Sequence, residues 1–236
     1  MTTLSPNFWN YQYKEGKDEW TSTTVDGTIL KNFEHLHEAS KLNILLPMCG
    51  KTGLLLSLAD KGHKVVGIEW AELAIVQFFE EHGLAYVKKE DKDVTVYSAK
   101  NKDITLYCCD ILLFNRLAGS FDLVIDHGSI GCVECKQEKR SSYAKIITSF
   151  LKPGGRIIFS FFDYIHSEHP SIPYAVTEDE VRLMYSEDSF KPLTLLQEID
   201  VKEAMELFSV KEEDDVHFPL WELSRYSWKI VLLTKK

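Results

Sequence analysis

The chain has 236 residues, of which 44% are hydrophobic and 27% are charged, a balance typical of a globular protein. Its formal net charge of -9 argues against a nucleic-acid-binding surface, which is usually basic. The five cysteines, an odd number, fit no disulfide framework, and no secretory signal or bilayer-spanning apolar run is visible. We therefore expect a soluble, cytoplasmic protein that acts without nucleic acid or membrane.

Predicted helices and strands alternate along most of the chain. An aromatic stretch at 8–20 comes first, and the spacing of Ile29, Phe33 and Leu36 then predicts a helix. Further strands are predicted at 43–48, 64–69, 103–109, 121–126, 156–162, 193–201 and 227–233, and further helices at 52–61, 71–81, 136–151 and 178–185. Apolar strands separated by helices indicate an α/β fold with a mainly parallel sheet and helices on both faces. The short connection before the last strand suits an antiparallel edge strand.

The first predicted strand runs into a loop with two glycines, Gly50 and Gly53, where the backbone can approach a ligand closely. The run from Gly50 through Lys51 to Thr52 resembles the end of a phosphate-binding loop, but Leu45 stands where that motif needs a glycine. A dinucleotide fingerprint needs three glycines, and only two can be placed here. Taken alone, the loop could equally be a plain strand-to-helix turn.

Two carboxylates follow at the ends of the next strands. Glu69 ends the second strand, where a carboxylate can accept hydrogen bonds from both hydroxyls of a ribose. Asp110 follows the third strand, where it could meet an adenine amine while Ile111 packs on the ring. Three successive strand ends then describe an adenosine without a pyrophosphate, which favours S-adenosylmethionine over a nicotinamide cofactor.

Several segments carry a family resemblance. They are the runs at 47–51, 59–69 and 106–109, Phe121-Asp122 with Asp126 and Gly128, His169-Pro170 with Pro173-Tyr174, and the run at 232–236. Through them the chain resembles the thiopurine S-methyltransferase family over nearly its whole length. The resemblance implies a class I methyltransferase fold, Rossmann-like, with a mainly parallel seven-stranded sheet, an antiparallel last strand and an N-terminal helical lid. It also implies a monomer that methylates a small-molecule thiol with S-adenosylmethionine and releases S-adenosylhomocysteine.

The resemblance also implies a set of site residues within one methyltransferase domain at 1–236, with a helical cap at 1–40 and a Pro/His-rich substrate loop at 163–176. The implied cofactor site comprises Trp9, Tyr13, Trp20, Met48, Gly50, Glu69, Trp70, Asp110, Ile111 and His127. The implied substrate site comprises Trp20, His127, Pro173 and His217. Aromatic faces attract a sulfonium cation by roughly 0.5–2 kcal/mol. The alternative for Trp9 and Trp20 is amphipathic helix packing.

Two histidines depart from the family pattern. The family commonly carries arginine where this chain has His127, and a second arginine aligns roughly with His217. Arginine is always charged, whereas histidine titrates near neutrality, so the preference for thiopurines is open. Structural hydrogen bonding is the alternative for both histidines.

For the mechanism we expect in-line attack of a soft nucleophile on the methyl carbon, with His127 orienting the nucleophile or accepting its proton and Asp126 supporting the loop. The alternatives are a halide, thiol or selenium-type methyltransferase, a cofactor-binding protein without catalysis, and a dehydrogenase. Cys132 and Cys135 form one pair, too few ligands for a zinc site, so no metal is expected. Cys108 and Cys109 are adjacent in a strand and are expected to pack on opposite sides.

Overall fold

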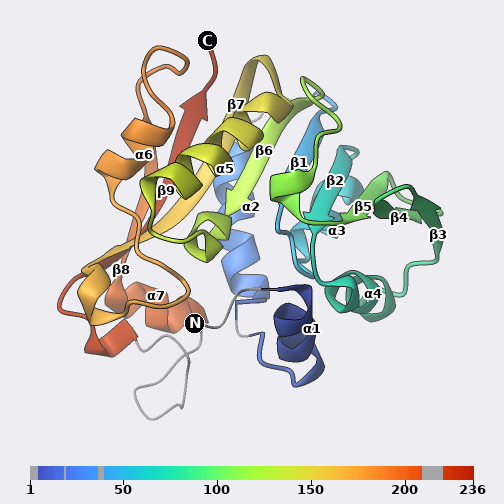
Figure 1. Cartoon of the computed structure of the whole chain (residues 1–236), viewed down its shortest axis with the longest axis horizontal. Coiled ribbons are helices and arrows are strands. Elements are labelled where there is room, and N and C mark those ends of the chain that lie inside the picture. The colour runs from blue at the N-terminus through green and yellow to red at the C-terminus, as the bar shows by residue number, and fades with distance from the viewer. Residues whose placement is uncertain (1–4, 19, 37–39, 209–219) are drawn as a thin grey trace.

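A computed structural model describes residues 5–18, 20–36, 40–208 and 220–236, and its centre is one nine-stranded sheet (Figure 1). In spatial order the strands are β3 (Tyr86–Asp91), β4 (Val94–Ala99), β5 (Ile104–Cys108), β2 (Lys64–Glu69), β1 (Asn43–Pro47), β6 (Phe121–His127), β7 (Leu151–Tyr164), β9 (Tyr226–Thr234) and β8 (Thr194–Asp200). The strands from β5 to β7 are parallel, whereas β9 is antiparallel to both β7 and β8. The predicted parallel core and antiparallel last strand are confirmed.

Two details of the predicted sheet are wrong. The sheet has nine strands rather than seven, because β3 and β4 form an antiparallel hairpin that extends the sheet beyond β5. The sequence predicted neither strand; β3 is largely exposed and polar, so it lacks an apolar run. β9 is not an edge strand, since it lies between β7 and β8, and helix α7 (Val201–Phe208) begins where β8 ends.

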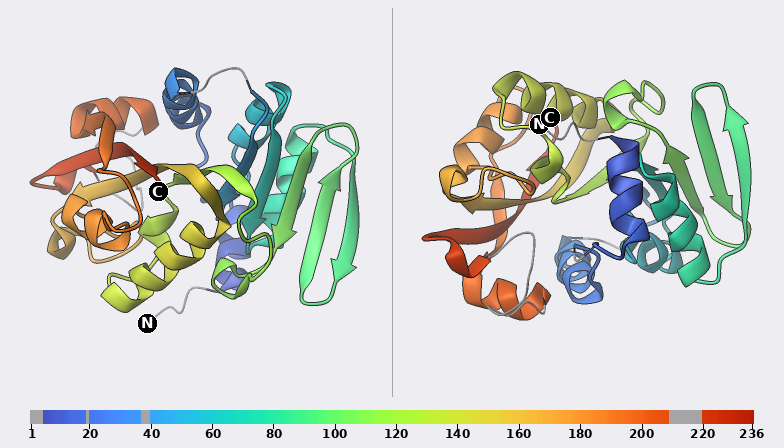
Figure 2. Two further views of the ribbon diagram at one scale, coloured as in Figure 1. Left: turned by 90° about the horizontal axis from the view of Figure 1, so that it is seen from above. Right: turned by 60° about the horizontal axis from the view of Figure 1, so that its bottom comes forward.

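Helices cover both faces of the sheet, as predicted (Figure 2). The remaining helices are α1 (Pro6–Lys14), α2 (Thr23–Leu36), α3 (Leu54–Asp60), α4 (Glu72–Glu81), α5 (Gln137–Phe150) and α6 (Glu178–Met184). Residues of α2, α3, α4 and α7 share one apolar cluster, and residues of α5 and α6 share a second. Because side chains alternate along a strand, Ile44 and Leu46 of β1 enter the first cluster and Leu45 enters the second. In the described part of the chain, no helix is long and apolar enough to cross a membrane.

The topology places four strand ends at one edge of the sheet. β1, β2, β5 and β6 are parallel neighbours, so the loops that follow them leave the same edge. In Figure 2 the N-terminal helix α1 lies beside α4, the helix that follows β2. The N-terminal segment therefore approaches the edge at which the parallel strands end.

Candidate functional site

The loop after β1 has a constrained backbone. Met48 has φ 44° and Gly50 has φ 54°, both in the left-handed region that side chains disfavour. The amide of Cys49 donates to the carbonyl of Ile68 at 3.1 Å, which fixes the loop against β2. A non-glycine residue in this conformation is strained, and such strain persists only where the surroundings hold it. The surrounding fold therefore holds the backbone of Met48 in a conformation that this residue would otherwise avoid.

Glu69 is held at the end of β2 by backbone amides from both sides. The residue is 7% exposed. Gly50 N–H donates to Oε2 at 2.8 Å, and Ala71 N–H donates to Oε1 at 2.7 Å. Burial raises the pKa of this carboxyl group, and the amide donors oppose the rise. Because a carboxylate offers about four acceptor positions and the backbone amides do not fill all of them, the group can also accept from a ribose hydroxyl, as an adenosine requires.

A cavity of about 480 Å³ adjoins the ends of β2 and β5. Trp70, Cys109 and Asp110 line it. Asp110 caps a short 3-10 helix, η1 (Ile111–Leu113), by accepting the amide of Leu112 at Oδ1, 2.8 Å away. Ile111 is 3% exposed and packs in the second apolar cluster. The site thus offers an acceptor and an aromatic ring beside one cavity, which suits an adenine base.

Three aromatic residues of the N-terminal segment lie together, and one of them, Tyr13, contacts the glycine loop. Trp20 packs edge-on against Trp9 and Tyr13, with ring centroids 5.7 and 5.8 Å away, and its Nε1 donates to the Tyr13 hydroxyl at 3.2 Å. The Tyr13 hydroxyl lies 2.5 Å from the position that a Cβ at residue 50 would take. Burial, and then the charge of Glu69, raise the pKa of Tyr13. The structure therefore brings Tyr13, Gly50 and Glu69 together.

His127 is the last residue of β6, which lies beside β1 in the sheet. Its Nδ1 lies 3.1 Å from the Ser160 hydroxyl of β7, and its ring packs 5.7 Å from Trp228 of β9. Burial lowers the pKa of the imidazole to about 4. A neutral imidazole presents one donor and one acceptor, so it can orient a polar group. As a base with so low a pKa, it is poorly matched to proton abstraction near neutral pH.

Asp126 does not join His127. The two are adjacent in β6, so their side chains leave opposite faces of the sheet. Asp126 is fully buried, and the Tyr143 hydroxyl of α5 donates to its Oδ2 at 2.8 Å. Burial raises the pKa of Asp126 to about 7, and hydrogen bonds from the Tyr143 hydroxyl and the Ser129 backbone amide oppose the rise. The Ser129 hydroxyl donates to the carbonyl of Pro47 at 2.8 Å, so the residues around Asp126 join the start of η2 to the end of β1.

Pro173 lies close to the loop that follows His127. A Cβ at Gly131 would lie 3.0 Å from the Pro173 Cβ, so these two residues are in close contact. The amide of Tyr174 donates to the Gly131 carbonyl at 2.7 Å. Gly131 belongs to η2 (Ser129–Cys132), directly after the His127–Gly128 pair. His217, the remaining residue of the implied substrate site, lies outside the described residues.

Cys132 and Cys135, near this loop, have different surroundings. Cys135 Sγ accepts from Arg140 Nη2 at 3.3 Å and lies 3.6 Å from His166 Nδ1. Burial raises the pKa of Cys132 to about 12, with smaller contributions from the charges of Glu69 and Asp126. Cys108 and Cys109 pack with opposite apolar clusters, as expected.

Sequence reasoning did not find the partners of His127. Ser160 is 33 positions away in the sequence and is the residue paired with His127 in the β6–β7 register. The register of parallel strands cannot be read from either strand alone. A serine inside an apolar strand was the one available signal, because a buried hydroxyl needs a partner.

Comparison with known proteins gives concordant results. The sequence profile of the thiopurine S-methyltransferase family matches residues 4–216. The chain is 32% identical to thiopurine S-methyltransferase of Bos taurus over 166 residues, 69% of this chain and 66% of the relative, and 30% identical to that of Panthera leo over 202 residues, 79% and 81%.

Solved structures share the fold at low sequence identity. The 1,6-didemethyltoxoflavin N1-methyltransferase of Burkholderia thailandensis, solved with S-adenosylhomocysteine, superposes with a TM-score of 0.64 at 15% identity over 98% of this chain and 87% of that one. The phosphoethanolamine N-methyltransferase 2 of Haemonchus contortus gives a TM-score of 0.61 at 13% identity, over 89% and 52%. At these identities the likeness shows a common fold alone.

Proposed function

The chain belongs to the thiopurine S-methyltransferase family of S-adenosylmethionine-dependent methyltransferases, and from that membership we propose that it methylates a thiol. The thiol class we propose is aromatic or heterocyclic, thiopurines included. The observation that carries the proposal is Glu69, a buried carboxylate held by the amides of Gly50 and Ala71 at the end of β2. It is the acceptor that the ribose hydroxyls of S-adenosylmethionine require.

For the cofactor we propose the following contacts. Glu69 binds the ribose hydroxyls, while Asp110, Trp70 and Ile111 bind the adenine. The backbone of Met48 and Gly50 borders the methionine part. The rings of Trp9, Tyr13 and Trp20 cover the sulfonium and exclude water, since aromatic faces attract cations and a covered site strengthens every polar contact within it. When bound, S-adenosylmethionine supplies an activated methyl group and leaves as S-adenosylhomocysteine.

For the acceptor we propose that His127, Trp20 and Pro173 form the binding surface, with His217 as a further member. The neutral imidazole of His127, held by Ser160, orients the nucleophile through a hydrogen bond. An aromatic or heterocyclic thiol is largely ionised near neutral pH, so little base catalysis is required. Asp126 supports the loop from the opposite face.

We further propose that one methyltransferase domain spans 1–236, with the cap at 1–40 and the substrate loop at 163–176, and that it acts as a cytoplasmic monomer. All five cysteines are free, which suits a reducing compartment. Sedimentation velocity at two protein concentrations and cell fractionation test the two statements, and a concentration-dependent dimer or a secreted product would contradict them.

The function is tested by a panel of acceptors. The chain is incubated with methyl-labelled S-adenosylmethionine and, in separate reactions, a thiopurine, thiophenol, an alkyl thiol, a selenide and iodide. We expect labelled thioether from the thiopurine or thiophenol. Transfer to selenide or iodide alone would indicate the halide or selenium-type alternative, and cofactor binding without any transfer would indicate a protein that only binds the cofactor.

A further inference from the structure

The Lys51 and Thr52 side chains, which in the sequence resemble the end of a phosphate-binding loop, are bound to the N-terminal segment. Lys51 Nζ lies 2.9 Å from Asp18 Oδ2 and 2.8 Å from Glu81 Oε1. The Thr52 hydroxyl donates to Asp26 Oδ1 of α2 at 2.6 Å. The two side chains therefore already bind carboxylates of this chain, and a phosphate ligand would have to displace these carboxylates.

The ion pair of Lys51 with Asp18 is sheltered from water. The two side chains are each 14% exposed, whereas the Glu81 side chain is 48% exposed. Burial lowers the pKa of Lys51, but the hydrogen bonds to Glu81 and Asp18 outweigh it, so that the pKa is raised. A sheltered lysine shared by two carboxylates contributes more than an isolated surface pair, because solvent screens it less.

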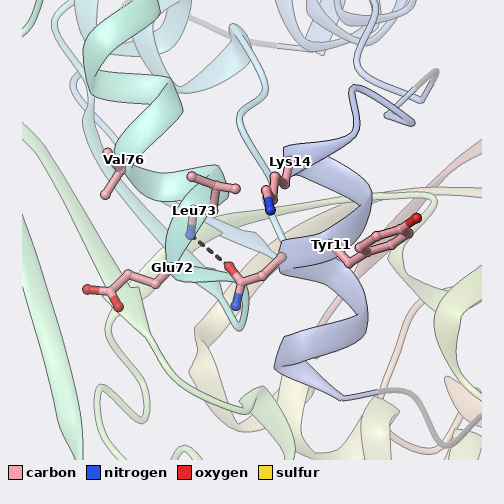
Figure 3. A pocket seen from close by; sticks show the side chains of 6 residues that line it. Tyr11, Lys14, Glu72, Leu73 and Val76 are labelled. Atoms are coloured by element: carbon pink, nitrogen blue, oxygen red, sulfur yellow. Dashed lines mark hydrogen bonds between the residues drawn. The ribbon is translucent and has the colours of Figure 1, made fainter.

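Two hydrogen bonds from α4 hold the helical part of the N-terminal segment. The Leu73 amide of α4 donates to Asn10 Oδ1 at 2.9 Å, and Figure 3 shows this bond with the Leu73 side chain between the two helices. Gln77 Nε2 of α4 donates to the Tyr13 carbonyl at 3.2 Å. Both contacts anchor α1 itself. Asp18 lies beyond the end of α1 and two positions before Trp20, so its ion pair joins the part that carries Trp20 to the loop after β1, whereas the Trp20–Tyr13 hydrogen bond ties Trp20 to α1.

We propose that Asp18, Lys51 and Glu81 form a latch that fastens the Trp20 end of the N-terminal lid to the cofactor loop, which makes Lys51 a positioning residue for S-adenosylmethionine. The inference rests on the proposed function, because it assigns the lid to that cofactor. Lys51 adjoins Gly50, whose amide binds Glu69, so the latch joins the lid to the loop that fixes the ribose-binding carboxylate. Release of the cofactor then requires the ion pair to open.

The test compares three single variants by the rate at which S-adenosylhomocysteine dissociates, measured by stopped-flow displacement. Lys51→Met keeps the aliphatic stem and removes the charge, and Asp18→Asn removes the opposite charge. The matched control is Lys41→Met, which breaks the exposed pair with Asp103, where the side chains are 61% and 47% exposed. We expect Lys51→Met and Asp18→Asn to raise the dissociation rate roughly five- to tenfold. Lys41→Met should leave it unchanged.

Two further measurements separate a latch from general destabilisation. Lys51→Arg should restore most of the wild-type rate, because it restores the charge. Trypsin should cut Lys51→Met after Lys17 faster than it cuts wild type, with or without cofactor. A wild-type dissociation rate in a folded Lys51→Met variant would overturn the latch, as would unchanged cleavage. Failure of wild type to bind the cofactor would instead overturn the proposed function, while the cleavage result would still decide whether the lid is latched.

Discussion

The proposed cofactor-binding and acceptor-binding sides of the site hold their polar groups in different ways. On the cofactor side, the Glu69 carboxylate is fixed by two backbone amides, from Gly50 and Ala71. On the acceptor side, the His127 imidazole is held by side chains, the hydroxyl of Ser160 and the ring of Trp228. Backbone donors persist whatever side chains surround them, whereas side-chain partners change with single substitutions. The acceptor side can therefore change its specificity while the cofactor side stays intact.

The largest expected effect comes from the cofactor side. In Glu69→Gln the amide nitrogen cannot accept a hydrogen bond, so one of the two backbone donors loses its acceptor. The neutral amide also gives the ribose hydroxyls a weaker acceptor than the carboxylate, which we expect to cost about 3–4 kcal/mol of binding and so to weaken S-adenosylmethionine binding by about two to three orders of magnitude. Calorimetric titration measures it. The control is Glu34→Gln on α2, which breaks an exposed ion pair with Lys61, and equal affinities in the two variants would contradict the assignment.

The next effect concerns the free energy of unfolding and Asp126, whose side chain lies on the face of the sheet opposite to His127. The pKa of Asp126 is raised from 3.8 to about 7 by burial, so between these values the folded chain keeps a proton that the unfolded chain loses. The stabilisation that this proton gives the folded chain, up to about 4 kcal/mol in the free energy of unfolding, is therefore complete below about pH 4. It is lost as the pH rises through 7.

Asp126→Asn carries no titrating proton, so this part of the decline in stability should disappear. Denaturant unfolding at several values between pH 4 and 8 measures the slope. The exposed Asp60→Asn should keep the wild-type slope. An unchanged slope in Asp126→Asn would show that the carboxyl group titrates normally.

A smaller effect is expected for the acceptor side itself. His127→Ala should lower turnover by about 10- to 100-fold, because the nucleophile loses its orienting hydrogen bond. The dissociation constant for S-adenosylmethionine should stay within about twofold, since the cofactor contacts do not depend on the imidazole. Ser160→Ala should lower turnover by only a few-fold, again with the cofactor dissociation constant unchanged, because it removes one hydrogen bond that holds the imidazole. Equal turnover in His127→Ala, or an equal loss of cofactor affinity, would remove His127 from the acceptor side.

The same contrast explains what the sequence could predict. Glu69, Asp110 and Gly50 follow successive strands of a parallel sheet, so a correct strand order is enough to bring them to one edge. The partners of His127 depend on the register between β6, β7 and β9, which no local pattern encodes. The alternation of side chains along a strand already indicates that Asp126 and His127 point to opposite faces of the sheet, which suits the supporting role expected for Asp126. The hairpin of β3 and β4 was missed because its outer strand is polar.

Methyl transfer measured beside cofactor binding tests the central claim most directly. Wild type, Glu69→Gln and His127→Ala are each titrated with S-adenosylmethionine and then assayed with labelled cofactor and thiophenol. We predict that wild type binds and forms the labelled thioether, Glu69→Gln loses binding, and His127→Ala binds normally but turns over slowly. Wild-type binding no tighter than that of Glu69→Gln, or the absence of any labelled thioether, would contradict the account.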